Sequence, residues 1–477
     1  MKGLRNVGVS VVFSLVAVAA SAQTFDTLVN FDATNGADPG YASLAQGVDG
    51  NYYGTTTSGG AHSGGTVFTI SAAGVLTTLY SFCSQIDSQG YCTDGLSPSA
   101  GLVLGTDGNF FGTTTNGGAN SFGRWNSNGT IFKITPSGTL TTLYSFCAEA
   151  NCADGQYPYA GLVQGTDGNF YGTTSQGGAS TACNSGNDIG CGTVFRITPT
   201  GHLTTLHSFA ATDGAYPYGS LIQSTNGQYY GTTSSGTIYK ITSSGVLTTL
   251  YSFQDTQGPY SGLLQAIDGN FYGTTYTGGA NRFGSIFRIT ESGVLTTLYS
   301  FCNPWPTCLD GSWPAAGLVQ GTDGNFYGTT TNYGTGGEGT IFTVTTDGSL
   351  TTLHNFDGSD GQKPLGVLLQ ATDGTFYGTT STYGPFYDGT LFALATNLSP
   401  FVKTLPAAAK IGAEVGILGA NLTGTTSVSF NSIPAQFRVK SPTLILARVP
   451  KGAATGYVAL TTPSGTLTSN LPFHVIP

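Results

Sequence analysis

Four short apolar segments recur in the same order along most of this chain. In one copy they cover residues 161–165, 169–174, 192–197 and 203–209. Asp167-Gly168 joins the first two segments and Pro199-Thr200-Gly201 joins the last two. Gly-bearing turns of this kind between apolar runs are strong hairpin signals, because Gly readily adopts φ > 0. The pattern predicts an all-β fold with four antiparallel strands in each repeat.

The second segment occurs seven times, each time with the same kind of turn before it. The spacing between copies is roughly 42 to 60 residues, a range typical of solenoids and propellers. Four strands per copy favour a β-propeller in which each repeat forms one blade. The copies begin at Asp49, Asp107, Asp167, Asn226, Asp268, Asp323 and Asp373.

The fourth segment follows the other three only six times, which leaves the last repeat one strand short. A matching segment stands at the other end of the repeat region, at residues 25–31. We expect it to pair with residues 389–394 and to close a seven-bladed ring, since closure removes the exposed edges of an open array. The alternative is an open solenoid, but solenoids need polar capping repeats, and the sequence has none.

Residues 161–174, 192–197 and 203–209 resemble the GloVer (Gloeo_Verruco) tandem repeat of exported bacterial proteins, and the resemblance extends over residues 24–397. It implies an exported repeat protein, in some members with an added surface anchor, and it implies no established activity. The fourth copy departs from the repeat, because Asn226-Gly227-Gln228 replaces Asp-Gly-Asn. We therefore do not expect the Asp-Gly-Asn triplets to share one chemical role.

The repeat ends near Leu398, and short strand-like segments with polar turns follow it. About 80 residues of this kind suit an immunoglobulin-like β-sandwich. The strand that contains Gly419, the Val428-x-Phe430 segment and Val449-Pro450 resemble the IPT/TIG family, which implies a spacer or adhesive unit. The expected organisation is a signal peptide at 1–22, a seven-bladed propeller at 23–397 and a sandwich at 398–477.

The first 22 residues have the pattern of a secretory signal peptide. Lys2 and Arg5 precede an apolar run at residues 7–20, and Ala20-Ser21-Ala22 fits a small-x-small cleavage site. A retained N-terminal anchor is the alternative, although the run is short for a membrane span. No transmembrane segment is expected in the mature chain. The expected location is therefore secreted or at the cell surface.

Charged residues are sparse, and acidic ones outnumber basic ones. Only 8% of the 477 residues are charged, the net charge is −9, and Lys and Arg form no cluster. This composition argues against nucleic acid and anionic membrane surfaces as partners. The 28 Phe and 25 Tyr residues argue against a disordered chain.

The eight cysteines form four pairs that are close in sequence. An even count together with a signal peptide favours disulfides in an oxidising compartment. Zinc is the alternative, but the spacings vary and each pair falls in a different repeat, whereas a zinc site gathers its ligands in one place. The expected pairs are Cys83 with Cys92, Cys147 with Cys152, Cys183 with Cys191 and Cys302 with Cys308.

The order of strands places the connecting loops at two opposite ends of each blade, so that each set of loops lies on one face of the ring. Turns 1–2 and 3–4 share one face, while the 2–3 loops and the crossovers between blades share the other. The second face holds the length variation and all eight cysteines, so we expect ligand binding there.

Five crossovers contain Asp-Gly followed by Pro. Their carboxylates either ring the channel mouth and bind a cation or make the turn, and turn chemistry is favoured because one Asp per blade is sparse for Ca²⁺. These aspartates are Asp94, Asp154, Asp213, Asp310 and Asp360.

Aromatic residues gather in the same loops. Exposed rings there would stack on sugars or grip a peptide, while the alternative is that they pack over the bases of the loops. The candidate ligand-binding residues are Tyr157, Tyr159, Tyr216, Tyr218, Tyr260, Trp305 and Trp313.

The sequence contains no recognisable catalytic constellation. It has no nucleophile elbow, no His-Glu-x-x-His motif and no phosphate loop. His207 and His354 stand where other copies have Tyr, which indicates packing within a strand. The repeated hairpin aspartates lie on the tight-turn face, too far apart to act as an acid and base pair. We therefore name no catalytic residue, no metal and no cofactor.

These patterns favour an exported, non-enzymatic binding or scaffold protein of the cell surface or extracellular matrix. The expected ligand of its loop-rich face is an extracellular polysaccharide or a surface protein. The alternatives are a secreted propeller-type carbohydrate-active enzyme, either a hydrolase or a lyase, and a purely structural surface component.

Overall fold

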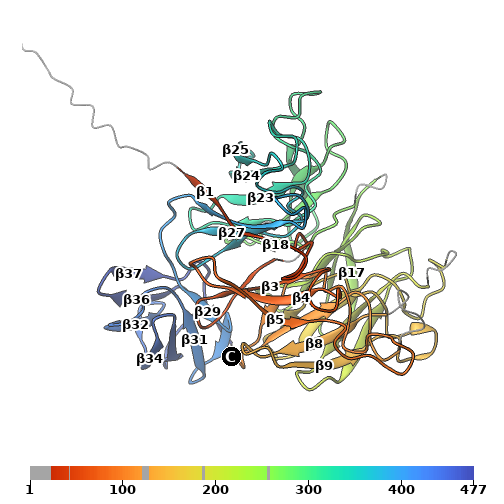
Figure 1. Cartoon of the computed structure of the whole chain (residues 1–477). Coiled ribbons are helices and arrows are strands. Elements are labelled where there is room, and N and C mark those ends of the chain that lie inside the picture. Colours follow the sequence, from red (N-terminus) through yellow and green to blue (C-terminus); the bar gives the residue numbers. More distant parts are fainter. Residues whose placement is uncertain (1–22, 42, 121–127, 185–188, 255–257, 477) are drawn as a thin grey trace, which may run out of the picture.

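The computed structural model describes residues 23–476, except residue 42 and residues 121–127, 185–188 and 255–257. Within these residues the regular secondary structure is almost entirely β-strand (Figure 1), and the one helical element is a single 3-10 turn, η1 (Ala150–Cys152). The expected signal peptide at residues 1–22 lies outside the described residues. In the described part of the chain, no helix has the length and apolar character needed to span a membrane.

Seven four-stranded antiparallel sheets follow one another through the described part of the repeat region. Each of the first six has a two-residue first strand, two five-residue strands and a six-residue fourth strand. Sheet 1 contains β2 (Ala45–Gln46), β3 (Tyr52–Thr56), β4 (Thr66–Ile70) and β5 (Leu76–Ser81). Sheet 2 contains β6 (Val103–Leu104), β7 (Phe110–Thr114), β8 (Thr130–Ile134) and β9 (Leu140–Ser145). Sheet 3 contains β10 (Val163–Gln164), β11 (Phe170–Thr174), β12 (Thr193–Ile197) and β13 (Leu203–Ser208).

The next three sheets have the same plan. Sheet 4 contains β14 (Ile222–Gln223), β15 (Tyr229–Thr233), β16 (Thr237–Ile241) and β17 (Leu247–Ser252). Sheet 5 contains β18 (Leu264–Gln265), β19 (Phe271–Thr275), β20 (Ser285–Ile289) and β21 (Leu295–Ser300). Sheet 6 contains β22 (Val319–Gln320), β23 (Phe326–Thr330), β24 (Thr340–Val344) and β25 (Leu350–Asn355).

Sheet 7 joins the two ends of the repeat region. Its strands are β26 (Leu369–Gln370), β27 (Phe376–Thr380), β28 (Thr390–Ala395) and, from the other end of the chain, β1 (Thr24–Asn30). The antiparallel register pairs Thr24 with Ala395 and Asn30 with Thr390. The strand pairing expected from the sequence is therefore present, and in Figure 1 the red β1 runs into the blue sheet that contains β27.

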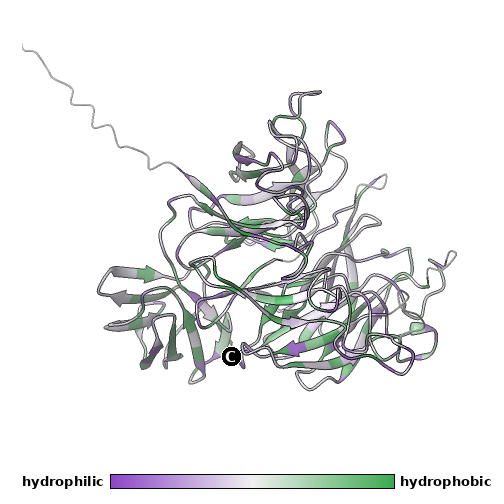
Figure 2. Cartoon of the chain, viewed as in Figure 1, coloured by the Kyte–Doolittle hydropathy of each residue, from purple (hydrophilic) through white to green (hydrophobic). Residues whose placement is uncertain are grey.

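Neighbouring sheets pack face to face, and the seventh packs on the first. Among the described residues, each of the seven neighbouring pairs shares its own buried apolar cluster. The cluster between sheets 7 and 1 includes Val29, Phe31, Phe68 and Tyr377. Figure 2 shows the apolar residues concentrated along the strands. The sheets thus form a closed, propeller-like ring.

The aromatic pair at the start of each second strand packs both faces of its sheet. Successive strand residues point to opposite faces. In sheet 3, Phe170 therefore stacks on Phe111 of sheet 2, while Tyr171 stacks on Tyr229 of sheet 4, both with ring centroids 4.0 Å apart. Equivalent contacts at 4.0 to 4.2 Å join the other neighbours, including sheets 7 and 1.

The glycine that follows this aromatic pair is required by close packing. A Cβ on Gly172 would lie 2.6 Å from Phe195 Cζ and 2.9 Å from Leu162 Cδ2. Carbon atoms in contact prefer roughly 3.5–4.0 Å, so any side chain at this position would displace the ring of the third strand. The glycine therefore lets the Phe195 ring and the Leu162 side chain pack directly on the second strand.

Residues 403–476 form a second unit with its own core. It contains two four-stranded antiparallel sheets, β29–β31–β35–β34 and β33–β32–β36–β37, and a parallel pair, β30–β38. The shared core includes Val415, Ile417, Val428, Ile445 and Leu460. The strands are β29 (Lys403–Leu405), β30 (Ala408–Lys410), β31 (Glu414–Leu418), β32 (Ser427–Phe430), β33 (Ile433–Pro434), β34 (Phe437–Ser441), β35 (Leu444–Arg448), β36 (Val458–Thr462), β37 (Gly465–Thr468) and β38 (His474–Ile476).

The second unit contacts the tight-turn side of sheets 1 and 7. Thr443 Oγ1 donates to the Val48 carbonyl at 2.8 Å, and Lys403 Nζ donates to the Gln370 carbonyl at 2.6 Å. Burial at this contact lowers the pKa of Lys403 to about 8, against the opposing effect of the nearby Asp373 carboxylate. The contacts lie on the side of the ring opposite to the crossover loops.

Candidate functional site

The crossover loops and the 2–3 loops lie together on one side of the ring. Backbone hydrogen bonds connect them, as where Trp313 N donates to Phe283 O at 2.8 Å and Gln156 N donates to Gln176 O at 2.9 Å. The four disulfides expected from the sequence are all present in these loops. They join Cys83 to Cys92, Cys147 to Cys152, Cys183 to Cys191 and Cys302 to Cys308.

A cavity of about 910 Å³ opens among these loops. Its wall consists mainly of the short segments that follow the crossover prolines and lead into the first strands. Sheet 3 contributes Tyr159, Ala160 and Gly161, and the other sheets contribute the equivalent positions. Because most of these residues are Ala, Gly or Ser, the wall leaves room for a ligand along the axis of the ring.

A threonine from each second strand holds the wall segment of the next sheet. Thr113 Oγ1 donates to Ala160 O at 3.1 Å, and Thr379 Oγ1 makes the equivalent bond across the ring closure to Pro39 O at 2.9 Å. The other five sheets have a corresponding bond, which goes either to the second residue after the crossover proline or to the proline itself. These donors are buried, so the wall segments are fixed by the sheets rather than by the loops.

Four of the candidate residues line the cavity: Tyr159, Tyr216, Tyr218 and Tyr260. Tyr159 and Tyr260 are 41% and 46% exposed. The half-buried Tyr218 lies between them, with ring centroids 5.2 Å from Tyr159 and 6.1 Å from Tyr260. Tyr157 is placed differently, and its carbonyl accepts hydrogen bonds from the amide and hydroxyl of Ser175.

Two further tyrosines of the wall, Tyr41 and Tyr276, were not among the predicted residues. Tyr41 is 54% exposed, and the Tyr276 ring lies 5.3 Å from that of Tyr260. Tyr276 directly follows a second strand, at a position where the other six copies have Ser or Thr. This departure from the repeat is the sequence signal that could have identified Tyr276 as a residue of the cavity wall.

The two candidate tryptophans lie beyond the wall of the cavity. Trp305 and Trp313 gather with Phe283 and Tyr333, and we call these four residues the outer aromatic cluster. The Tyr276 ring lies 6.3 Å from Trp313 and so connects the cavity to this cluster. The aromatic residues that the sequence places in separate loops are therefore mostly brought into one region.

The described lining of the cavity contains no charged side chain. It consists of Tyr, Ser, Gln and small or aliphatic residues. Burial raises the pKa of Tyr41, Tyr159 and Tyr276 above the ordinary tyrosine value of 10.0. These hydroxyls therefore stay protonated at neutral pH, and the cavity offers apolar ring faces together with neutral hydrogen-bonding groups.

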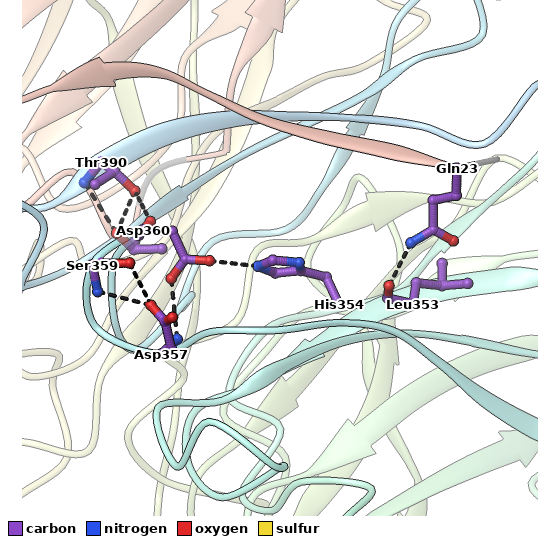
Figure 3. A network of polar contacts seen from close by, with 8 residues as sticks. Gln23, Leu353, His354, Asp357, Ser359, Asp360 and Thr390 are labelled. Atoms are coloured by element: carbon purple, nitrogen blue, oxygen red, sulfur yellow. Dashed lines mark hydrogen bonds and ion pairs between the residues drawn. The ribbon is translucent and has the colours of Figure 1, made fainter.

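Each of the five crossover aspartates accepts a hydrogen bond from the preceding fourth strand. The Tyr80 hydroxyl donates to Asp94 at 2.7 Å, and His354 Nε2 lies 2.7 Å from Asp360 Oδ2, as Figure 3 shows. The other pairs are Tyr144 with Asp154, His207 with Asp213 and Tyr299 with Asp310. The two histidines thus make the hydrogen bond that tyrosine makes in other copies. The sequence pattern predicted only that they pack within a strand and did not predict this bond.

These carboxylates are occupied within their own turns. Backbone amides bind them as well, as where Ser84 N donates to Asp94 at 3.0 Å. Figure 3 shows the same arrangement around Asp360, whose carboxylate accepts from Asp357 N at 3.1 Å. Within the described ranges, no three His, Cys, Asp or Glu residues come together as a metal site would require. The contacts agree with the turn role that the sequence favours.

The hairpin aspartates also serve their turns. The Asp167 carboxylate accepts from Asn169 Nδ2 at 2.7 Å and from the Tyr171 hydroxyl at 2.8 Å. Equivalent bonds occur at Asp49, Asp268 and Asp323. The Asp-Gly-Asn triplet therefore fixes the 1–2 turn to the tyrosine of the second strand.

The sequence pattern of the Gloeobacter/Verrucomicrobia repeat matches residues 11–184, 92–262 and 234–429. No curated protein matches the chain. Among solved structures, the extracellular domain of a putative one-component system from B. thetaiotaomicron is 10% identical, with a TM-score of 0.49 over 96% of this chain. This chain spans 58% of the length of that domain.

Two smaller proteins are also similar in structure. A putative glucose dehydrogenase from Thermus thermophilus is 15% identical, with a TM-score of 0.40 over 78% of this chain and 100% of its own. A gluconolactonase from Xanthomonas campestris is 12% identical, with a TM-score of 0.36 over 79% of this chain and 90% of its own.

Proposed function

Since this chain belongs to the Gloeobacter/Verrucomicrobia repeat family, we propose that its seven sheets are the blades of one seven-bladed β-propeller with a binding function. The seven inter-sheet clusters and the closing strand β1 support this blade count. The C-terminal unit is an immunoglobulin-like sandwich of the IPT/TIG type that serves as a spacer. Its two four-stranded sheets around one core support that assignment.

The protein works outside the cytoplasm, either secreted or at the cell surface. Four disulfides in surface loops support an oxidising compartment, because cytosolic thiols are kept reduced. The signal-peptide pattern of residues 1–22 supports export.

The ligand of the crossover face is a neutral glycan. The observation that carries this proposal is the uncharged cavity whose wall includes six tyrosines. A pyranose ring has an apolar face of C–H bonds and a rim of hydroxyl groups. The tyrosine rings match the apolar face, while Ser, Gln and tyrosine hydroxyls match the rim.

The proposed role is binding without catalysis. Hydrolysis of a glycosidic bond ordinarily needs two carboxyl groups on either side of the scissile bond. The described wall of the cavity supplies neither Asp nor Glu, and the crossover carboxylates are engaged by Tyr, His and backbone amides. These contacts support a binding protein over an enzyme.

Tyr260→Ala tests the glycan proposal. The wild-type protein should bind at least one of soluble β-glucan, xylan or mannan in calorimetry, and loss of the Tyr260 ring should weaken that binding about tenfold, the scale of one aromatic contact. Tyr457→Ala is a matched control, because Tyr457 is 44% exposed and lies on the C-terminal unit, whereas Tyr260 is 46% exposed. The control should bind as the wild type does.

Two outcomes contradict the proposal. One is release of reducing ends from any of these polymers by the wild-type protein, which would make it an enzyme. The other is equal weakening by both substitutions, which would place glycan binding away from the cavity.

A further inference from the structure

The outer aromatic cluster is a surface of contiguous rings. The Phe283 ring lies 5.2 Å from Trp305, 5.6 Å from Trp313 and 6.1 Å from Tyr333, and the last two lie 6.0 Å apart. Trp305 is 63% exposed and rests on the half-buried Phe283, nearly parallel to it at 27°. Tyr333 is 37% exposed, so two of the four rings reach the surface, and exposed aromatic rings gathered in this way are typical of binding sites.

The cluster is continuous with the cavity. From Tyr159 the rings proceed through Tyr218, Tyr260 and Tyr276 to Trp313, then to Phe283 and Trp305. Each step between ring centroids is 5.2 to 6.3 Å. A step of this size is comparable to one sugar unit in a linear polysaccharide. This series of aromatic rings extends over the loops of sheets 3 to 6 and is therefore much longer than a monosaccharide.

The loop that carries Trp305 is held in place before any ligand arrives. The Cys302–Cys308 disulfide closes its base, and Cys308 N donates to Pro304 O at 3.1 Å. Asp310, which is buried, accepts from Asn303 N at 3.0 Å. Because the loop is already ordered, less conformational entropy is lost when a ligand binds.

The rings of the cluster pack on one another around Phe283 at its centre. An aromatic cage for a quaternary ammonium ion needs an open centre that the cation fills. A group of contacting rings instead presents one broad apolar face, which suits the face of a sugar ring lying on Trp305.

We propose that the outer aromatic cluster is a second subsite for a neutral, linear polysaccharide that continues outward from the cavity. This inference rests on the proposed glycan-binding function and adds the size of the ligand. The cavity holds one end or an inner segment of the chain, and Trp305 stacks on a unit several residues along it.

Length dependence tests the inference. Calorimetry compares the trisaccharide and octasaccharide of the cello, xylo and manno series on the full-length secreted protein. Trp305→Ala should weaken binding of the octasaccharide about tenfold and leave the trisaccharide unchanged. Trp305→Phe keeps an aromatic ring and should restore most of the loss. Phe386→Ala is the control, since Phe386 is an exposed ring in a 2–3 loop of sheet 7, and it should change neither affinity.

The outcomes separate the two proposals. If Tyr260→Ala weakens both oligosaccharides while Trp305→Ala weakens neither, the second subsite is overturned and the glycan-binding cavity stands. If the wild type binds no oligosaccharide of any length and instead binds a proline-rich peptide, both are overturned. Trp305→Ala should unfold at the wild-type temperature, because the Trp305 side chain is mostly exposed.

Discussion

Tyr239 differs from its counterparts in the other sheets by one hydroxyl group. The third strands of the other sheets have Phe at this position, namely Phe68, Phe132, Phe195, Phe287, Phe342 and Phe392. The Tyr239 hydroxyl is buried and has no hydrogen-bond partner among the described residues. Burial also raises its pKa above the ordinary tyrosine value. An unpaired buried hydroxyl costs about 1–3 kcal/mol.

Tyr239→Phe is therefore expected to stabilise the protein. The free energy of unfolding in urea should rise by about 1–2 kcal/mol, because the ring stays and only the unpaired hydroxyl is lost. Tyr230→Phe is the control in the same sheet, since the Tyr230 hydroxyl is bound by Asn226 at 2.9 Å, and it should not stabilise. A loss of stability in Tyr239→Phe would show that the hydroxyl has a partner after all.

At the scale of elements, β1 contacts three sheets. It is the fourth strand of sheet 7, and Val29 and Phe31 enter the core shared with sheet 1. Phe25 stacks on His354 of sheet 6, with ring centroids 3.6 Å apart. One seven-residue strand, with the Phe31 that follows it, therefore contributes to the packing of sheets 6, 7 and 1.

Phe31→Ala should destabilise the ring by about 3–5 kcal/mol, the usual cost of deleting a buried Phe side chain. Thr27→Ala, an exposed position next to β1's core-facing residues, should change stability by no more than about 0.5 kcal/mol. Urea unfolding measures both. Hydrogen exchange in Phe31→Ala should accelerate first in β1 and β28. Equal effects of the two substitutions would mean that β1 does not hold sheets 7 and 1 together.

For the whole molecule, partly buried tyrosine hydroxyls next to carboxylates recur around the ring. Burial, reinforced by the carboxylate of Asp94, raises the pKa of Tyr80 to about 12, and burial with Asp268 does the same for Tyr272. In the unfolded chain these groups titrate near 10. Between pH 10 and 12 the unfolded state therefore loses protons that the folded state keeps, which favours unfolding.

The melting temperature should accordingly stay nearly constant from neutral pH to about pH 9 and fall as the pH rises from about 10 to 12. The double substitution Tyr80→Phe and Tyr272→Phe removes two of the responsible groups and should make the fall shallower. Differential scanning calorimetry across this range measures both. An unchanged slope in the double variant would assign the alkaline loss to other groups.

The parts of this structure that local patterns encode were predictable from sequence. Turns at Asp167-Gly168, apolar segments and neighbouring cysteine pairs are all read within a few residues, and they predicted the strands and the disulfides. The β1–β28 pairing followed from the count of repeated segments, which leaves the last repeat one strand short. The outer aromatic cluster was only half predicted. Phe283 and Tyr333 belong to 2–3 loops of sheets 5 and 6, and the packing of these two sheets brings them beside Trp305 and Trp313.

Because Thr24 pairs with Ala395, β1 cannot find its partner strand until nearly all of the ring has been synthesised. β1 is made before the other strands of the ring, and its partner β28 is the last of them to be made. Contacts this distant in sequence form slowly, and a strand that is still unpaired is prone to aggregate. We therefore expect nascent or truncated chains that lack β28 to aggregate more readily than the finished ring.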